Sequence, residues 1–325
     1  MKIPSVRSQY TFGILTTPTK DIFHSNYHLG LLAGICPRIK ALKGQLKIVM
    51  MPAKPHFPSK KLKVNGTSPG NPLGKNDKSQ DKPYKSLQEI LTKNGLDGLL
   101  ILTWRWIHPS IAKLIETTAH SRVLVVNDPV PGLQVNIVST DTNAGMAQTV
   151  AHLIRKGRRK IGMLHGPTKV PFKIKGKEIL VPFIDTRLKE EGFLKALKAK
   201  RLVVNKKWIR SGAANTEAEG FSVMTKWLRE KDLPEAIVCG NDDLAFGVVR
   251  ALKKAGKRVP QEVAVIGFDD NERAKSFSPP LTTVRQPLAQ MGKDAVDILI
   301  RKIRRPASRP EAKRYIPKLI ARKTA

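Results

Sequence analysis

Three apolar runs in the sequence each end in a pair of polar residues that could hold a small molecule by hydrogen bonds. Residues 127–128 are Asn-Asp after the run RVLVV, residues 241–242 are Asn-Asp after EAIVCG, and residues 269–270 are Asp-Asp after VAVIGF. A carboxylate accepts several hydrogen bonds and an amide both donates and accepts, so these pairs suit the hydroxyl groups of a polar ligand.

Helix capping is the competing interpretation, because Asp and Asn just before a helix also cap its first turn. For Asp242 and Asp270, ligand binding and capping both stay open. For Asn241 and Asp269 we favour ligand binding.

Patterns for catalysis or metal binding are weak. The sequence contains neither GxSxG nor HExxH. His24 and His28 have a spacing that suits a metal ion, but no third ligand is evident. Cys36 and Cys239 lie far apart without metal spacing, so we expect neither a disulfide framework nor a zinc ribbon. The sequence therefore predicts a protein that is not an enzyme and that has no catalytic residues, bound metal or cofactor.

The elements that position the polar pairs alternate between strand and helix patterns, and this alternation occurs twice along the chain. The strand patterns are continuous apolar runs, which is typical of parallel strands covered on both faces. The expected fold class is α/β, with two doubly wound parallel-sheet lobes whose ligands bind at the carboxyl ends of the strands. Strands are predicted at 10–16, 46–51, 97–102, 122–128, 160–166, 201–204, 235–242 and 263–270, and helices at 29–42, 86–94, 109–120, 186–200, 216–231 and 243–256.

Two segments interrupt this alternation. Residues 52–85 are rich in Pro, Gly, Asn, Ser and Lys without an apolar period, which predicts a flexible basic insertion. Residues 167–184 are longer than a strand-to-helix connection needs and could form a small hairpin. Pro37 is expected to kink or end the first part of the helix at 29–42.

Composition limits the class of protein. The 325 residues are 41% hydrophobic, which is enough for a packed core. No apolar run is long enough to span a membrane, and no secretory signal is evident, so we expect a cytoplasmic protein without membrane partners. The 59 Lys and Arg against 26 Asp and Glu give a net charge of +33, densest at 38–85 and 301–323. This charge is either an attraction to polyanions or simply a basic solvated surface.

Several strings occur together in a characteristic order. Residues 236–300 contain GNDDLAFG, VPQEVAVIGFDD and SPPLTTVRQP, and residues 127–167 and 187–197 add further matching strings. The chain resembles the effector-binding core of LacI/GalR-type transcription regulators, most closely from about residue 122 to 325. The resemblance implies a periplasmic-binding-protein-like type I fold, with two lobes, crossover strands and a ligand cleft between the lobes.

On this resemblance we divide the chain into a short tail and two lobes. The tail is residues 1–9, and the N-terminal lobe is 10–158, completed by about 287–305. The C-terminal lobe is 159–286, completed by about 306–325.

The resemblance also implies ligand-binding residues. Asn241, Asp269 and Gln286 match positions that contact ligand in the family, and Asn127 stands where the family often has Asp. The string HSNYH at the end of the first strand adds three further candidates, which are Asn26, Tyr27 and His28.

Two departures from the family pattern concern the ligand. The family commonly has an Arg three residues before the Gly that is Gly192 here, whereas this chain has Lys189, with Arg187 nearby as a further candidate. Lysine is a point charge and cannot reproduce the planar fork of arginine. Ala213 and Ala214 stand where the family often has an aromatic platform. These departures argue against ordinary sugar binding. The predicted ligand is a small polar metabolite, either sugar-like or nucleobase-like.

A third departure is at the N-terminus, where only about ten residues precede the first predicted strand. A helix-turn-helix headpiece does not fit into that length, so we expect a core that lacks it. DNA binding is then expected only through a missing or separate headpiece, or as weak non-specific binding.

The predicted function is a sensor domain of the LacI/GalR type that binds a small-molecule effector and signals by lobe closure. A homodimer is the expected assembly. One alternative is a solute-binding or sugar-binding protein, and another is a basic protein that binds nucleic acid non-specifically.

Overall fold

The computed structural model describes residues 9–16, 26–50, 87–102, 120–127, 134–174, 177–230 and 232–325. The chain forms two compact units. Unit 1 comprises Met1–Ser139, Pro171–Val181 and Leu288–Arg314, and unit 2 comprises Thr140–Val170, Pro182–Pro287 and Tyr315–Ala325. The expected insertion at 52–85, almost all of the predicted helix at 109–120, and the residues His24 and Asp128 lie outside the described residues.

Unit 1 contains a six-stranded sheet. Its strands are β1 (Thr11–Thr16), β2 (Gln45–Met50), β3 (Gly98–Ile101), β4 (Val123–Val126), β5 (Asn136–Thr140) and β13 (Ala312–Tyr315). The strand order is β13-β5-β4-β3-β1-β2, and the strands from β1 to β5 pair in parallel. The sheet is doubly wound, because the chain leaves β1 toward β2 on one side and toward β3 on the other.

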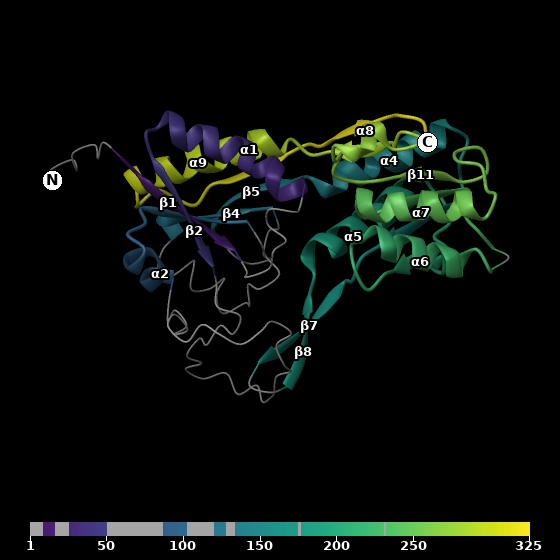
Figure 1. Cartoon of the computed structure of the whole chain (residues 1–325), viewed down its shortest axis with the longest axis horizontal. Coiled ribbons are helices and arrows are strands. Elements are labelled where there is room, and N and C mark those ends of the chain that lie inside the picture. The colour runs from purple at the N-terminus through teal and green to yellow at the C-terminus, as the bar shows by residue number, and fades with distance from the viewer. Residues whose placement is uncertain are drawn as a thin grey trace. The chain divides into compact units, whose positions relative to one another are not determined.

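Helices cover both faces of this sheet (Figure 1). They are α1 (Asn26–Ala41), α2 (Leu87–Lys93) and α9 (Leu288–Arg304), with a 3-10 helix, η2 (His120–Arg122), before β4. Neighbouring residues of β3 show the two faces: Gly98 faces Leu299 of α9, whereas Leu99 packs in a cluster with Leu91 of α2. The strands β1, β3, β4 and β5 are therefore buried on both sides, as their continuous apolar runs predicted, whereas the edge strands β2 and β13 are largely exposed.

Helices α1 and α9 approach each other very closely because glycines stand at their crossing. A Cβ on Gly34 would lie 1.8 Å from the carbonyl oxygen of Ala289, and a Cβ on Gly292 would lie 2.2 Å from that of Leu31. Helix α1 continues to Ala41 with Pro37 inside it, so of the two expected effects of Pro37 an end of the helix is excluded and a kink stays a prediction. The close packing of α1 on α9 stabilises the helix by more than the missing backbone hydrogen bond of proline costs.

Unit 2 contains a four-stranded parallel sheet with the order β11-β10-β6-β9. Its strands are β6 (Ile161–His165), β9 (Ile209–Ser211), β10 (Ala236–Cys239) and β11 (Ala264–Ile266). Its helices are α4 (Thr142–Arg155), α5 (Ile184–Ala199), α6 (Glu217–Trp227), α7 (Asp242–Lys254) and α8 (Arg273–Ser276), with a 3-10 helix, η3 (Lys206–Trp208). Alternate residues of each strand pack into different clusters: Ile237 packs with α6 and α7, and Val238 packs with α4 and α5.

Two further pairs of strands complete the described structure. Strands β7 (Lys169–Ile174) and β8 (Lys177–Pro182) form a two-stranded sheet, so the predicted hairpin within 167–184 is confirmed. Strands β12 (Thr283–Arg285) and β14 (Lys318–Ile320) pair antiparallel.

The strand predicted at 201–204 was wrong. These residues form no strand, and Val203 is 79% exposed. Leu202 and Val204 pack against the cluster of α4 and α5, so their apolar character serves loop packing rather than sheet pairing. The strand that pairs with β6 is β9, which has only three residues and therefore leaves a weak pattern.

The change from unit 1 to unit 2 falls between Ser139 and Thr140, whereas the sequence-based division placed it at 158/159. Helix α4 accounts for the difference. Its buried residues Met146, Val150 and Leu153 pack with Phe193 and other apolar residues of unit 2. Among the described residues, none of the helices combines the length and apolar character needed to cross a bilayer.

The crossing of α1 and α9 leads to a stability prediction. Gly34→Ala gains about 1 kcal/mol of helix propensity, but its Cβ meets backbone that cannot rotate away. Because overpacking typically costs about 1–3 kcal/mol and here involves a backbone oxygen, we expect a net loss of about 1–3 kcal/mol in the free energy of unfolding. Urea denaturation measures it. Ala33→Ser adds one atom at an exposed neighbour and is the control, expected within about 0.5 kcal/mol of the wild type. Equal midpoints for the two variants would contradict the close crossing.

Candidate ligand-binding site

The strand order of unit 2 reverses at β6. The chain passes from β6 to β9 on one side of the sheet and to β10 and β11 on the other. Ligands of doubly wound sheets bind outside the carboxyl ends of the strands at such a reversal. The residues at this edge include His165 at the end of β6, Asn241 after β10 and Asp269 after β11.

Asp269 is held in a defined orientation by its neighbours. Its backbone has φ of 115°, an uncommon conformation for a residue other than glycine, and its N–H donates to the carbonyl oxygen of Val284 at 2.9 Å. Its Oδ1 accepts a 2.8 Å hydrogen bond from Nε2 of Gln286. Gln286 is itself buried, and its Oε1 accepts a hydrogen bond from Thr140 at 2.5 Å. The structure thus brings together two residues that the sequence predicted, Asp269 and Gln286.

The pKa of Asp269 is raised to about 6, mainly because burial removes water from the carboxylate. The positive charge of Lys189 and the hydrogen bond from Gln286 oppose this shift, while Asp185 and Asp243 add to it. The ionised form of Asp269 is therefore less stable in the folded chain than in water. Hydrogen-bond donors of a ligand would stabilise this form.

Lys189 is a buried lysine on α5 with defined contacts. Its Nζ donates to Oδ2 of Asp185, one helical turn earlier, at 2.8 Å, and lies 4.5 Å from the centre of the Phe268 ring. Arg187 is on the same helix but is about half exposed, and it pairs with Glu191 at 3.2 Å. Lys189 therefore belongs to the surroundings of Asp269, whereas Arg187 lies on the exposed side of α5.

Asn241 caps helix α7 and uses both ends of its amide. Its Oδ1 accepts from the backbone N–H of Leu244 at 2.9 Å, and its Nδ2 donates to the carbonyl oxygen of Asn215 at 3.0 Å. The capping interpretation therefore applies to Asn241, for which we favoured ligand binding. It does not apply to Asp242, which is the first residue of the helix rather than its cap.

Asp242 anchors the loop after β11. Its buried carboxylate accepts hydrogen bonds from the backbone N–H of Asn271 at 2.7 Å and from the hydroxyl of Thr283 at 2.5 Å. Burial and the nearby charge of Asp269 raise its pKa well above the usual range. Asp270 is not a helix cap either, because its carboxylate pairs with Arg285 at 2.5 Å and with Arg322 at 2.6 Å.

The fold is similar to that of several solved transcription regulators. The structure of a LacI family transcriptional regulator from Enterococcus faecium with bound ribose is 20% identical, with a TM-score of 0.69 over 97% of this chain and 98% of that chain. The Lac repressor dimer bound to operator and the anti-inducer ONPF is 21% identical, with a TM-score of 0.73 over 98% of this chain and 95% of that chain.

Sequence relatives agree with this fold. Residues 150–325 match the family described as periplasmic binding protein-like domain. The HTH-type transcriptional repressor PurR of Pasteurella multocida (strain Pm70) is 30% identical over 250 residues, which are 77% of this chain and 70% of that repressor. The chain belongs to the LacI family. PurR of Haemophilus influenzae (strain PittEE) is 30% identical over 228 residues, so the match spans 70% of this chain and 63% of that repressor.

In this LacI-family chain, the remaining predicted residues lie in unit 1. Asn127 follows β4, has φ of 93°, and donates its backbone N–H to the carbonyl oxygen of Val138 at 2.7 Å. Asn26 is the exposed first residue of α1, and the rings of Tyr27 and His28 meet edge to face with centres 5.5 Å apart. These residues and those of unit 2 thus form two separate sets, each at the ends of its own strands or at a helix start.

Sequence reasoning missed several polar residues of the unit 2 set. Thr140 orients Gln286, Asp185 pairs with Lys189, and His165 lies 3.5 Å from Glu190. Only Asp185 carried a usable signal, because its spacing of four from Lys189 on a helix predicts an ion pair. Within the described ranges, no group of three or more His, Cys, Asp or Glu side chains suits a metal ion.

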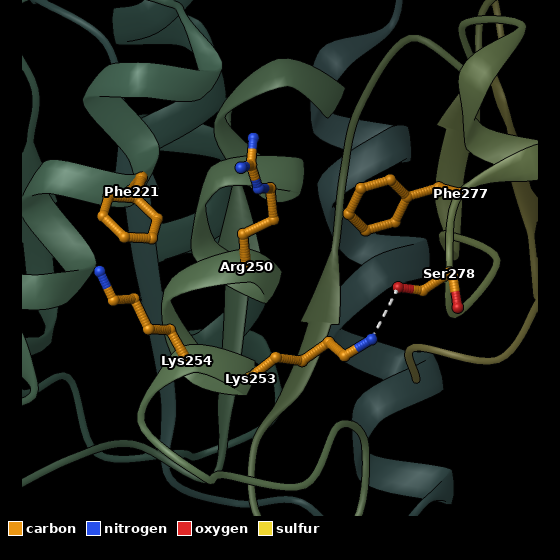
Figure 2. Close-up of a pocket in the computed structure, with 6 residues that line it drawn as sticks. All are labelled: Phe221, Arg250, Lys253, Lys254, Phe277 and Ser278. Carbon is orange, nitrogen blue, oxygen red and sulfur yellow. Dashed lines mark hydrogen bonds between the residues drawn. The ribbon is translucent and has the colours of Figure 1, made fainter.

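A hollow of about 450 Å³ lies beside α6 and α7 of unit 2, away from Asp269 (Figure 2). Arg250 points into it but pairs with Glu217 at 2.8 Å, and Nζ of Lys253 lies 3.5 Å from the carbonyl oxygen of Ser278. Sequence reasoning singled out none of its residues, and they are not at the strand ends. The residues around it are Phe221, Arg250, Lys253, Lys254, Phe277 and Ser278.

The pKa of Asp269 leads to a second prediction, on stability. Its value of about 6 in the folded chain exceeds the ordinary 3.8, so between about pH 4 and 6 the folded state binds more protons than the unfolded state. Stability contributed by this group is therefore lost as the pH rises through that window. Asp269→Asn cannot ionise and keeps an oxygen for Gln286, so we expect it to exceed the wild type by about 1–3 kcal/mol at pH 7 and to match it near pH 4.

Urea denaturation at several pH values measures the difference. Asp232→Asn changes an exposed acid and is the control, expected to follow the wild type at every pH. A difference for Asp269→Asn that does not vary with pH would refute the desolvation of Asp269.

Proposed function

We propose that the chain is the effector-binding core of a LacI-family transcription regulator and that it binds a small polar metabolite, either sugar-like or nucleobase-like. The observation that carries this proposal is the arrangement around Asp269. Gln286 orients the carboxylate, Lys189 of α5 lies near it, and all three residues belong to unit 2. Support from relatives is that the Enterococcus faecium regulator has bound ribose and the CelR regulator was solved as a complex with cellobiose.

The chemistry of the site favours a ligand with several hydrogen-bond donors. The partly desolvated carboxylate of Asp269 is stabilised by hydroxyl or ring N–H groups, which donate to it without adding charge. Lys189 donates a hydrogen bond to Asp185, and its positive charge favours an oxygen of the ligand nearby. Lysine holds such an oxygen as a point charge, so a planar carboxylate is not required.

We further propose that the ligand contacts both lobes and that binding favours one arrangement of the lobes over another. On the side of unit 1, the contacts would come from Asn26, Tyr27, His28 and Asn127. A ligand shifts such an equilibrium only through the difference in its affinity for the two arrangements. Lobe closure is then the signal that the regulator transmits.

The regulator acts without catalysis, as a cytoplasmic homodimer, and reaches its operator through a helix-turn-helix segment. Support for this part of the proposal is that the Lac repressor was solved as a dimer bound to operator and that PurR is named a repressor of helix-turn-helix type. The chain also carries a net charge of +33, from which we propose a weak affinity of its own for DNA.

Ligand binding is tested through Asp269. We expect D-ribose, cellobiose, D-glucosamine or adenine to raise the melting temperature of the wild type, and Asp269→Ala to abolish that shift while leaving the unliganded fold intact. Because a ligand donor needs the ionised carboxylate, affinity should rise about tenfold between pH 5 and pH 7, through the pKa of about 6. Calorimetry on the probe that binds measures both effects.

Glu272→Ala removes an exposed acid three residues from Asp269 and is the matched control, expected to bind as the wild type does. Unchanged affinity in Asp269→Ala would remove Asp269 from the site and overturn the proposed function.

DNA binding by the chain itself is tested by its response to salt. Contacts of Lys and Arg with phosphates release counterions, so affinity for duplex DNA should fall by about 10³-fold between about 50 and 200 mM salt if about six phosphates are engaged. Changing one base pair should alter binding by much less than the roughly 1–3 kcal/mol of a specific site. A competition gel shift measures both, and one sequence that survives an excess of scrambled competitor would show specific recognition instead.

A further inference from the structure

His165 is a buried histidine at the carboxyl end of β6, and its hydrogen bond fixes its tautomer. The ring is 3% exposed, and Nδ1 lies 2.7 Å from the carbonyl oxygen of Gly166. A carbonyl oxygen only accepts, so Nδ1 must carry the hydrogen and donate it. In the neutral ring, Nε2 is therefore the acceptor.

Nε2 of His165 lies 3.5 Å from Oε2 of Glu190 on α5. A carboxylate oxygen is also an acceptor, so two acceptors face each other, and at least one hydrogen-bond donor is needed to satisfy them. A proton on Nε2 can supply it, and so can a donor group on a bound molecule. No other ion pair or hydrogen bond of the Glu190 side chain is found among the described residues. The Glu190 side chain is 29% exposed.

The surroundings place this pair within the candidate site of unit 2. A Cβ on Gly240, the residue before Asn241, would lie 3.3 Å from Cα and Cβ of His165. Glu190 follows Lys189 directly along α5. His165 thus contacts the residue before Asn241, and Glu190 is the neighbour of Lys189 along α5.

We propose that His165 and Glu190 bind an amino or ammonium group of the effector, an assignment that rests on the proposed function. An amino nitrogen about 2.9 Å from each atom can donate one hydrogen to Nε2 and another to Oε2. A hydroxyl group has a single hydrogen and satisfies only one of the two acceptors. The carboxylates of Glu190 and Asp185 add an electrostatic preference for a cationic nitrogen, which the ammonium of Lys189 partly opposes. The effector would then be an amino sugar or an aminated nucleobase.

Matched pairs of probes test the assignment. D-glucosamine and D-glucose differ by one amino group in place of a hydroxyl, and adenine and purine differ by one exocyclic amino group. For the pair that binds, calorimetry on the wild type should show the amino member at least about tenfold tighter, as expected for a hydrogen bond to a charged group.

Glu190→Gln removes the charge of the proposed binding residue while keeping its size, so it tests ligand recognition in a folded chain. The glutamine amide can donate to Nε2 itself, so the variant should keep or raise the melting temperature. It should bind the amino member and the other member of the pair with about equal affinity. Glu191→Gln removes an exposed charge at the next residue, already paired with Arg187, and should keep the full preference. If Glu190→Gln does not fold, His165→Leu removes the other acceptor and should reduce the same ratio.

The outcomes distinguish this assignment from the proposed function. Binding that depends on Asp269 but shows equal affinity for both members of each pair overturns the amino assignment alone. A preference that persists in Glu190→Gln overturns it as well. If neither member of either pair binds the wild type, the amino assignment fails. The proposed function then survives if D-ribose or cellobiose binds through Asp269, and it fails as well if neither of them binds.

Discussion

The burial of one carboxylate determines the geometry of the candidate site. Asp242 has almost no exposure, and it is stabilised there by the backbone N–H of Asn271 and the hydroxyl of Thr283. Its Oδ1 would lie 2.2 Å from a Cβ on Gly267, so only glycine fits at the start of the loop after β11. This loop carries Asp269 in its uncommon backbone conformation, which costs free energy and persists only because the loop is fixed at both sides.

The electrostatics of this edge oppose those of the whole chain. The protein has a net charge of +33, yet burial and neighbouring carboxylates raise the pKa of Asp242 and of Asp269. Burial and the charge of Asp269 make Asp242 harder to ionise, and burial together with Asp185 and Asp243 does the same to Asp269. Both effects lower the stability of the folded chain near neutral pH. A site that sacrifices stability in this way is expected where a ligand restores the missing interactions.

The sequence predicted the two doubly wound sheets and the position of Asp269, because long apolar strands and their polar ends leave a local pattern. It did not predict β9, which is too short for a pattern, or the assignment of α4 to unit 2, which depends on packing against Phe193. The roles of Asn241 and Asp242 were also beyond it. Both types of residue cap helices and bind ligands, and only the tertiary contacts show that Asn241 caps α7 while Asp242 holds a distant loop.

In the proposed site, the preference for a ligand would depend on a different element of unit 2 from the one that fixes the loop geometry. The loop after β11 provides an anchoring carboxylate whose orientation follows from buried contacts that tolerate little change. Helix α5 carries Lys189 and Glu190, adjacent residues of opposite charge, one bound to Asp185 and the other 3.5 Å from His165. The helix packs in the core of unit 2 mainly through its apolar residues, such as Phe193 and Leu197. On the proposed function, substitutions on this helix would change the effector preference, since the function belongs to the site and not to the fold.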